Sequence, residues 1–262
     1  MNKVAVVLTH YREELTDDEA ISLRQMYAHL GRYDKFLVFP DTLSPRFKTM
    51  DVCLRRLNRK YFENLSSYSR LLVSEEFYNL FRQYEYILIY QMDCLVFRDE
   101  LLEWCYRGYD YVGAPLFRHA LKKDGPFFAV GNGGFSLRNV ASFLRVLRCP
   151  LPDYRGFFRM PITRYTLYLL LIHNLMRLFR IPRFFRYYKN LFFENEDMFW
   201  SFFAETGLPS FSIPDVDTAL GFSFEKKPRI CFDLTGGTLP FGCHAWARYD
   251  REFWISHLTE RE

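Results

Sequence analysis

The stretch YILIYQMDCLVF, Tyr86 to Phe97, joins an apolar strand pattern to a charge that a buried strand does not tolerate. Apolar and aromatic residues lead up to Gln91, and Asp93 follows two positions later. A bare carboxylate in a core is costly unless it is paired, hydrogen-bonded or bound to a metal. Either the strand ends near Asp93 and turns this carboxylate toward a cleft, or the strand interpretation is wrong.

The N-terminal segments predict an α/β fold around this strand. VAVVLTH, residues 4–10, is typical of a first buried parallel strand. Residues 17–31 predict a helix, with acidic residues at its start and Gly31 at its end. KFLVFP, which closes at Pro40, predicts the second strand. A β-α-β unit of this kind favours a right-handed, doubly wound sheet.

The remaining segments alternate between strand and helix patterns. They predict a loop, a short strand and a helix over 41–70, a helix capped by Ser74, a strand over 84–97, a short helix capped by Asp99, a strand with a turn over 109–117, a strand with a glycine-rich turn over 127–139, a helix over 140–149, a helix over 194–206, and short strand-and-loop segments over 211–225 and 239–246.

Composition indicates a folded protein of 262 residues, 49% hydrophobic and 19% aromatic. The net charge of +4 is too small to indicate nucleic-acid binding. The six cysteines form no CxxC pair, so we expect reduced thiols in a cytoplasmic protein rather than a zinc site or a disulfide framework. We find no signal-peptide pattern and no run approaching the ~18 apolar residues of a membrane span.

Residues 150–190 interrupt the α/β pattern, and we expect a single domain over 1–262 that carries a basic, aromatic helical insertion there. Residues 154–193 hold seven Arg and one Lys but no Asp or Glu. Basic residues recur every three positions from Arg177 to Lys189, which is typical of a helix lying on an anionic membrane surface. The alternatives are helices packed on the domain with solvated arginines, or a nucleic-acid surface, which ranks last.

Asp93 and His244 are candidates for binding a metal ion. Ligands of open α/β sheets bind at the carboxyl ends of the strands, where an exposed Asp can coordinate a divalent cation that holds a diphosphate. His244, in PFGCHAW, would add an imidazole, and this mixture of donors suits manganese. The ordinary alternatives are an Asp that caps a turn or pairs with an Arg, and a hydrogen-bonded structural His.

The segment VGNGGFSLRN contains Gly131, Gly133 and Gly134, which let a backbone approach a ligand closely or adopt a positive φ. It has neither the GxGxxG spacing nor the lysine of a P-loop, so it is not a standard phosphate cradle. Taken alone, the segment favours a hairpin turn, for which Asn-Gly is a strong signal.

The segment ENEDMFWSFF opens a predicted helix with Glu196 and Asp197. The helix dipole favours acidic residues at this position and is expected to lower their pKa values. Two carboxylates beside a cleft could divide the work, one binding a substrate hydroxyl and the other deprotonating the nucleophile. The alternative is an ordinary acidic first turn.

In this order, the four segments resemble the nucleotide-sugar glycosyltransferases of the GT-A fold. In that group a strand ends in a DxD motif, a Gly-Gly segment follows, an acidic pair opens a later helix, and a C-terminal His completes the metal site. YILIYQMDCLVF, GNGGFSLRN, NEDMFW and PFGCHAW closely resemble an uncharacterised bacterial glycosyltransferase-like family, over about residues 1–149 and 190–250. The resemblance implies an α/β, GT-A-like (Rossmann-like) mixed sheet flanked by helices.

The resemblance also implies a role for each site residue. It implies a Mn or Mg site at Asp93 and His244, donor contacts from Thr9, His10, Tyr11 and Gln91, sugar and acceptor beside Gly133 and Gly134, Asp197 as catalytic base, and Glu196 as its acceptor- or sugar-binding partner. Gln91 stands where the family has the first Asp of DxD and brings no charge. This departure leaves open a weaker metal site, a metal that arrives with the diphosphate, or a reaction without metal.

The activity implied is an inverting transfer from a UDP-linked donor to a glycan or lipid-linked acceptor, in bacterial polysaccharide or lipopolysaccharide biosynthesis at the inner face of the membrane. One alternative is a non-catalytic glycan- or nucleotide-binding relative, which Gln91 keeps open. Another is a nucleotidyltransferase or phosphotransferase, which should show more than one Asp near the end of the Asp93 strand.

Overall fold

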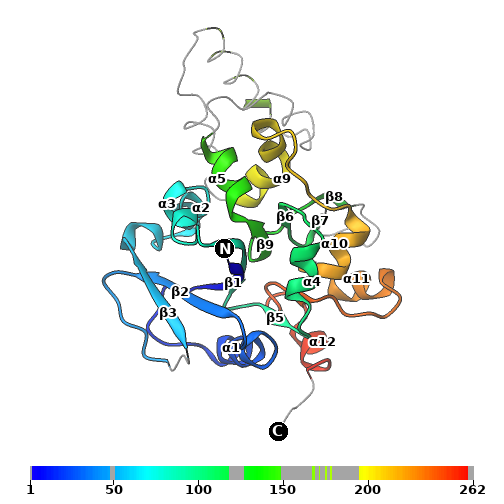
Figure 1. Cartoon of the computed structure of the whole chain (residues 1–262). Helices are drawn as coiled ribbons and strands as arrows, with labels where there is room; N and C mark the ends of the chain where they lie inside the picture. Colours follow the sequence, from blue (N-terminus) through cyan, green and yellow to red (C-terminus); the bar gives the residue numbers. More distant parts are fainter. Residues whose placement is uncertain are drawn as a thin grey trace.

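The structure is a computed structural model that describes residues 2–47, 51–117, 127–148 and 195–258, with five isolated positions between 167 and 178 (Figure 1). The predicted insertion at 150–190 and the basic segment 154–193 lie outside the described residues, apart from those five positions. Their boundaries therefore stay predictions.

Strands and helices alternate through the first half of the chain, as the sequence predicts. The strands are β1 (Asn2–Thr9), β2 (Asp34–Pro40), β3 (Val52–Leu57), β4 (Tyr84–Gln91), β5 (Leu95–Val96), β6 (Tyr111–Val112), β7 (Pro115–Phe117), β8 (Phe127–Val130), β9 (Phe135–Asn139), β10 (Ser223–Phe224) and β11 (Gly242–Cys243). The helices are α1 (Asp17–Leu30), the 3-10 turn η1 (Arg59–Tyr61), α2 (Leu65–Leu72), α3 (Glu75–Asn79), α4 (Leu101–Tyr106), α5 (Val140–Arg148), α9 (Glu196–Gly207), α10 (Val216–Phe222), α11 (Pro228–Leu234) and α12 (Arg251–Ile255).

The main sheet has the strand order β3-β2-β1-β4-β9-β6. Strands β3, β2, β1 and β4 run parallel, whereas β9 pairs antiparallel with both β4 and β6. The predicted α/β class, with a mixed sheet flanked by helices, is confirmed. Because β1 and β4 are parallel neighbours, with Thr9 opposite Gln91, the loops that follow them meet at one edge of the sheet.

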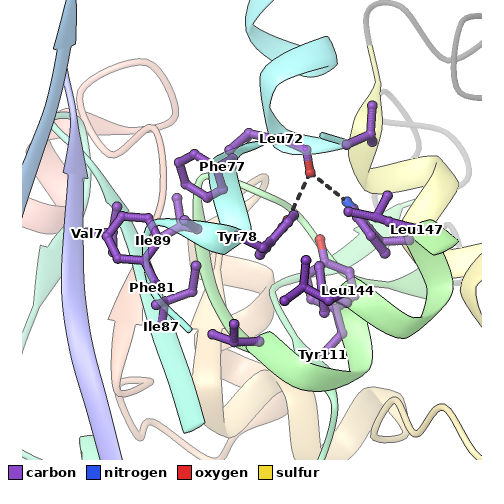
Figure 2. Packing of buried hydrophobic residues seen from close by; sticks show 14 of the residues in the cluster. Val7, Leu72, Phe77, Tyr78, Phe81, Ile87, Ile89, Tyr111, Leu144 and Leu147 are labelled. Carbon is purple, nitrogen blue, oxygen red and sulfur yellow. Dashed lines mark hydrogen bonds between the residues drawn. The ribbon is translucent and has the colours of Figure 1, made fainter. Parts of the chain in front are cut away.

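Alternate residues of the central strands feed two separate apolar cores, because successive strand side chains point to opposite faces. On one face Val7, Ile87 and Ile89 pack with residues of α2, α3, α5 and α9 (Figure 2). On the other face Leu8 and Leu88 pack with residues of α1 and α4. Each fully buried side chain of this size contributes about 1.5–3 kcal/mol, so the register of the central strands is strongly determined.

Two helix starts were predicted from capping residues, and only one is confirmed. The Ser74 hydroxyl accepts a hydrogen bond from the Phe77 amide at 3.2 Å and caps α3. Helix α4 instead begins after Glu100, without a side-chain cap. Asp99 accepts a hydrogen bond from the Tyr33 hydroxyl at 2.6 Å, because a partner distant in sequence competes for its carboxylate.

The C-terminal part forms a small sheet in the order β10-β11-β5, covered by a third core with α10 and α12. Helix α10, capped by Asp215, lies where the sequence predicts only strand and loop. Strand β11 is antiparallel to β5, with Cys243 opposite Leu95. This register places His244 next to the turn that carries Asp93.

No helix in the described part of the chain is long and apolar enough to cross a membrane. The cysteines at 53, 94, 105, 231 and 243 are free thiols, as expected, and four of them are buried.

Candidate functional site

Strand β4 ends at Gln91, so the first alternative for the opening stretch is confirmed. The chain turns after Gln91, whose carbonyl accepts a hydrogen bond from the Cys94 amide at 3.0 Å. About half of the Asp93 side chain, 47%, is exposed. Its carboxylate therefore lies at the carboxyl edge of the sheet rather than in the core.

A cavity of about 430 Å³ opens at this edge. Its lining includes Thr9, His10 and Tyr11 at the end of β1 and Gln91 and Asp93 at the end of β4, so five of the six residues predicted for the donor and its metal line one cavity. The sixth, His244, is outside the lining and contacts Gln91 and Asp93. Their chemical roles stay predictions. The rest of the lining consists of Glu19, Phe62, Glu63, Asn64, Leu65, Tyr68 and Met92.

The last residue of β1 and the two residues that follow it differ in what they offer to a ligand. Tyr11 is 56% exposed, so its ring is not part of the core and its face is available for stacking. His10 is buried against Phe47, and desolvation lowers the pKa of its imidazole, which favours a neutral ring. The hydroxyl of Thr9 lies 2.8 Å from that of Tyr68 and already has a hydrogen-bond partner.

His244 lies among three polar side chains. Its Nε2 is 3.1 Å from Gln91 Oε1 and 3.4 Å from Asp93 Oδ1, and its Nδ1 is 3.6 Å from Glu225 Oε1. Burial disfavours the charged ring, but Asp93 and Glu225 outweigh it and raise the pKa of His244 to about 10. Burial likewise opposes ionisation of Asp93, yet the His244 ring holds the pKa of Asp93 below its ordinary value.

No group of three His, Cys, Asp or Glu side chains among the described residues is arranged for a metal. The predicted cation would therefore need the Gln91 amide as a third ligand, and His244, whose pKa is raised to about 10, would have to lose its ring proton to bind it. The metal site stays a prediction. Adjacent ligands of an octahedral ion at ~2.1 Å lie about 3 Å apart, close to the 3.1 and 3.4 Å separations here. His244 Nδ1 is buried without a hydrogen-bond partner and faces Glu225, the place of the outer carboxylate of many metal-bound histidines.

The glycine-rich segment is not a hairpin. Strand β8 pairs with β7, whereas β9 pairs with β4 and β6, so the segment crosses between two sheets. A Cβ at Gly133 would overlap the Glu196 carboxylate, and a Cβ at Gly134 would overlap the His244 ring. The two glycines thus make room for two site residues from distant parts of the chain. Their predicted contacts with sugar and acceptor stay predictions.

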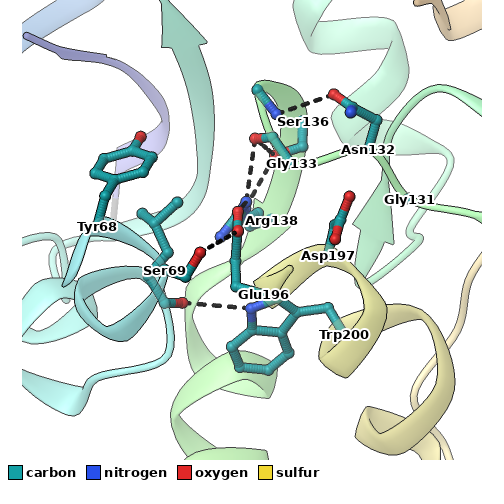
Figure 3. Close-up of polar contacts among 12 residues, drawn as sticks. Tyr68, Ser69, Gly131, Asn132, Gly133, Ser136, Arg138, Glu196, Asp197 and Trp200 are labelled. Carbon is teal, nitrogen blue, oxygen red and sulfur yellow. Dashed lines mark hydrogen bonds and ion pairs between the residues drawn. The ribbon is translucent and has the colours of Figure 1, made fainter. Parts of the chain in front are cut away.

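Glu196 and Asp197 leave the start of α9 in different directions (Figure 3). Glu196 is buried, accepts a hydrogen bond from the Ser69 hydroxyl at 3.3 Å and lies 3.6 Å from the guanidinium of Arg138. Arg138 is fully buried and also donates to the carbonyl of Gly133 at 3.1 Å. These contacts hold Glu196 against the glycine-rich segment.

Asp197 differs from the expectation of a lowered pKa. Desolvation, followed by the charge of Glu196, raises the pKa of Asp197 to about 7, although the Met198 amide donates a hydrogen bond to its Oδ1 at 2.8 Å. The helix dipole falls off within one turn and is outweighed by loss of water and a like charge. A carboxylate with this pKa can accept a proton near neutral pH.

Sequence reasoning missed Tyr68, Arg138 and Glu225. Arg138 left a signal, since a charged residue in the strand pattern FSLRN indicates a buried partner. Tyr68 and Glu225 left none, because α2 and the residue after β10 reach the site only through the tertiary structure.

Comparisons with known proteins give a family and several similar folds. A family described as "Protein of unknown function (DUF5672)" matches residues 51–244, and no curated protein matches the chain. The galactosyltransferase LgtC in complex with donor and acceptor sugar analogs is 13% identical with a TM-score of 0.48, over 98% of this chain and 97% of that chain. An active-site mutant of LgtC is 12% identical with a TM-score of 0.45, over 92% and 86%. The apo-form glycosyltransferase GlyE of Streptococcus pneumoniae TIGR4 is 14% identical with a TM-score of 0.46, over 98% and 60%.

Proposed function

The chain belongs to the protein family of unknown function DUF5672, and we propose that this member is a glycosyltransferase of the GT-A type. It would move a sugar from a UDP-linked donor to a hydroxyl of a glycan or lipid-linked acceptor. One observation carries the proposal: Gln91 and Asp93 line a 430 Å³ cavity at the carboxyl edge of the sheet, and both lie within 3.4 Å of His244 Nε2. The Glu196 carboxylate of α9 lies against Gly133 of the glycine-rich segment.

In this proposal the cavity holds the nucleoside, and the turn after β4 that carries Asp93 holds the diphosphate. The exposed ring of Tyr11 would stack on the base. The described lining of the cavity contains Glu19, Glu63 and Asp93 but no Lys or Arg, so the charge of the diphosphate requires a cation that enters with it.

Gln91, Asp93 and His244 would hold that cation, a Mn²⁺ or Mg²⁺ ion. When bound, the ion would stabilise the negative charge that develops on the leaving diphosphate. Glu225 would orient His244 through Nδ1, so that Nε2 faces the ion.

Asp197 would act as the general base. As the acceptor oxygen bonds to the anomeric carbon, the bond from that carbon to the diphosphate breaks and the acceptor proton passes to Asp197. Attack from the face opposite the leaving group inverts the anomeric centre. Glu196 is proposed as the partner that binds acceptor or sugar, although its oxygens already contact Ser69 and Arg138.

Incubation with a panel of nucleotide sugars, with and without Mn²⁺, tests the function. We expect release of nucleoside diphosphate from one donor, dependent on the cation, and loss of that release in Asp93→Ala. The reason is that Asp93 is the one carboxylate facing His244 Nε2 within 4 Å among the described residues. Donor binding without turnover for every sugar would favour a non-catalytic relative, and transfer of a nucleotidyl group would overturn the proposal.

We further propose that the basic segment 154–193 lies on an anionic membrane, on its inner face. The sequence supplies its positive charge. Among the isolated described positions, four leucines at helical spacing are exposed: Leu167, Leu171, Leu175 and Leu178. Apolar residues beside a run of arginines are typical of interfacial helices.

Flotation with anionic and with neutral liposomes tests this contact. We expect the protein to float with anionic vesicles, and the variant with Arg177, Arg180, Arg183 and Arg186 changed to Glu to stay behind, since each basic residue contributes about 1 kcal/mol near such a surface. A matched control changes the exposed Arg24 to Glu, outside the segment. Equal flotation of wild type and the four-residue variant would rule the contact out.

A further inference from the structure

A chain of polar contacts connects the end of β1 with His244. The hydroxyls of Thr9 and Tyr68 are 2.8 Å apart, and Gln91 Nε2 donates to the Tyr68 hydroxyl at 3.1 Å. The other end of the same amide, Oε1, lies 3.1 Å from His244 Nε2. Tyr68 comes from α2 and contacts Gln91 from the side opposite His244.

The orientation of the Gln91 amide decides what it presents to His244 and Asp93. The two ends of an amide have nearly the same shape, but the oxygen accepts and the nitrogen donates two hydrogens. Only Oε1 can coordinate a cation or accept a hydrogen bond from the imidazole. The reversed amide would point two N–H groups at the cation, and a partner that accepts a hydrogen bond from Nε2 disfavours that reversal.

We propose that Tyr68 is a positioning residue, whose hydroxyl holds the Gln91 amide with Oε1 toward His244 and Asp93. This inference rests on the proposed function, because it gives Gln91 its part in holding the cation. It also accounts for an amide at the position where the GT-A pattern has a carboxylate, which needs no such restraint because its two oxygens are equivalent.

The hydroxyl of Tyr68 is suited to this role. A phenol carries one proton at physiological pH, so the hydroxyl can donate one hydrogen bond and accept others. With Thr9 as the acceptor of that proton, the oxygen of Tyr68 is left to accept from Gln91.

Titration calorimetry with Mn²⁺ alone, without nucleotide, measures the consequence. We expect Tyr68→Phe to weaken Mn²⁺ binding about 10–100-fold, the usual effect of losing a group that orients a metal ligand. Tyr61→Phe is the matched control, because the Tyr61 hydroxyl donates to Glu76 at 2.6 Å on the surface, and its Mn²⁺ affinity should equal that of the wild type. Equal affinity in Tyr68→Phe and wild type would overturn the inference.

A second background separates positioning from general packing. In Gln91→Glu the side chain presents an oxygen in either orientation, so adding Tyr68→Phe should change Mn²⁺ affinity by less than about threefold. If Tyr68→Phe still weakens Mn²⁺ binding about 10–100-fold when Gln91 is replaced by Glu, Tyr68 does not act through the amide and the inference is wrong.

A readout in the metal-free protein distinguishes this inference from the proposed function. Hydrogen exchange of the Gln91 side-chain amide can be followed by NMR. It should be about five- to tenfold faster in Tyr68→Phe, because the variant loses one hydrogen bond that protects this amide. If the wild type binds no Mn²⁺ but this exchange rate rises as stated, the cation site fails and the positioning role stands. Unchanged exchange overturns the positioning role, whatever the protein's activity.

Discussion

Asp197→Asn is expected to lower the kcat of sugar transfer by about 10²–10⁴-fold, the range for removal of a general base. Asn keeps the shape of the side chain but cannot accept the acceptor proton. Because desolvation and Glu196 raise the pKa of Asp197 to about 7, the wild-type carboxylate is an effective base near neutral pH. Initial rates at saturating donor and acceptor measure the loss, and donor affinity should change little.

The pH dependence of kcat/KM shows in which protonation state Asp197 acts. Asp197 is active when deprotonated, so kcat/KM of the wild type should rise with pH up to about 7 and level off above it. Glu196→Gln removes the neighbouring negative charge, so the pKa of Asp197 falls and the rising limb should move to lower pH. If the rising limb of kcat/KM stays at the same pH in Glu196→Gln, the group that titrates in this limb is not Asp197.

Asp217→Asn is the matched control for this position. Asp217 is also in the first turn of a helix, α10, but it is exposed and far in sequence from the glycine-rich segment. Its rate should equal that of the wild type. If Asp197→Asn keeps more than a tenth of the wild-type kcat, Asp197 is not the base.

Gly134→Ala is expected to abolish Mn²⁺ binding and cation-dependent transfer together. The added methyl group would overlap the His244 ring, which is only 14% exposed. The backbone amide of His244 is held by a hydrogen bond to the Phe224 carbonyl at 3.0 Å. The ring has to move away from Asp93 and Gln91, and overpacking of this kind costs about 1–3 kcal/mol. Calorimetry measures the loss of Mn²⁺ binding, and thermal unfolding measures the loss of stability from overpacking.

The control for added volume is Gly221→Ala. A Cβ there would lie 3.7 Å from the Trp104 ring, which is ordinary contact, and Gly221 is inside helix α10, where Ala is favoured by up to about 1 kcal/mol. We expect unchanged Mn²⁺ affinity and equal or higher stability. Wild-type Mn²⁺ affinity in Gly134→Ala would contradict the placement of His244 in the site.

Local patterns were sufficient for most of the fold. The apolar runs that became β1, β2 and β4 are continuous because these strands are covered on both faces. Ser74 marked the start of α3 because a cap bonds to an amide three residues away. Such signals are short-range and can therefore be recognised in a single sequence.

Pairing between distant segments could not be derived in this way. The glycine-rich segment favours a hairpin locally, but β9 gains more by pairing with the buried strand β4 than with its neighbour β8. Asp99 does not cap α4, because its carboxylate accepts a hydrogen bond from the Tyr33 hydroxyl, 66 residues away. Local preference and tertiary contact compete at these positions, and the contact prevails.

Periodicity and residue chemistry were enough to predict the α/β class and the end of the strand before Asp93, whereas the roles of the site residues stay predictions. The contact between Gln91 and His244, 153 residues apart, with Tyr68 at the other end of the amide, follows from the tertiary structure alone. That structure alone raised the pKa of Asp197, since loss of water and the charge of Glu196 depend on how α9 packs. Orientation and desolvation are properties of three-dimensional packing, and no spacing in the chain encodes them.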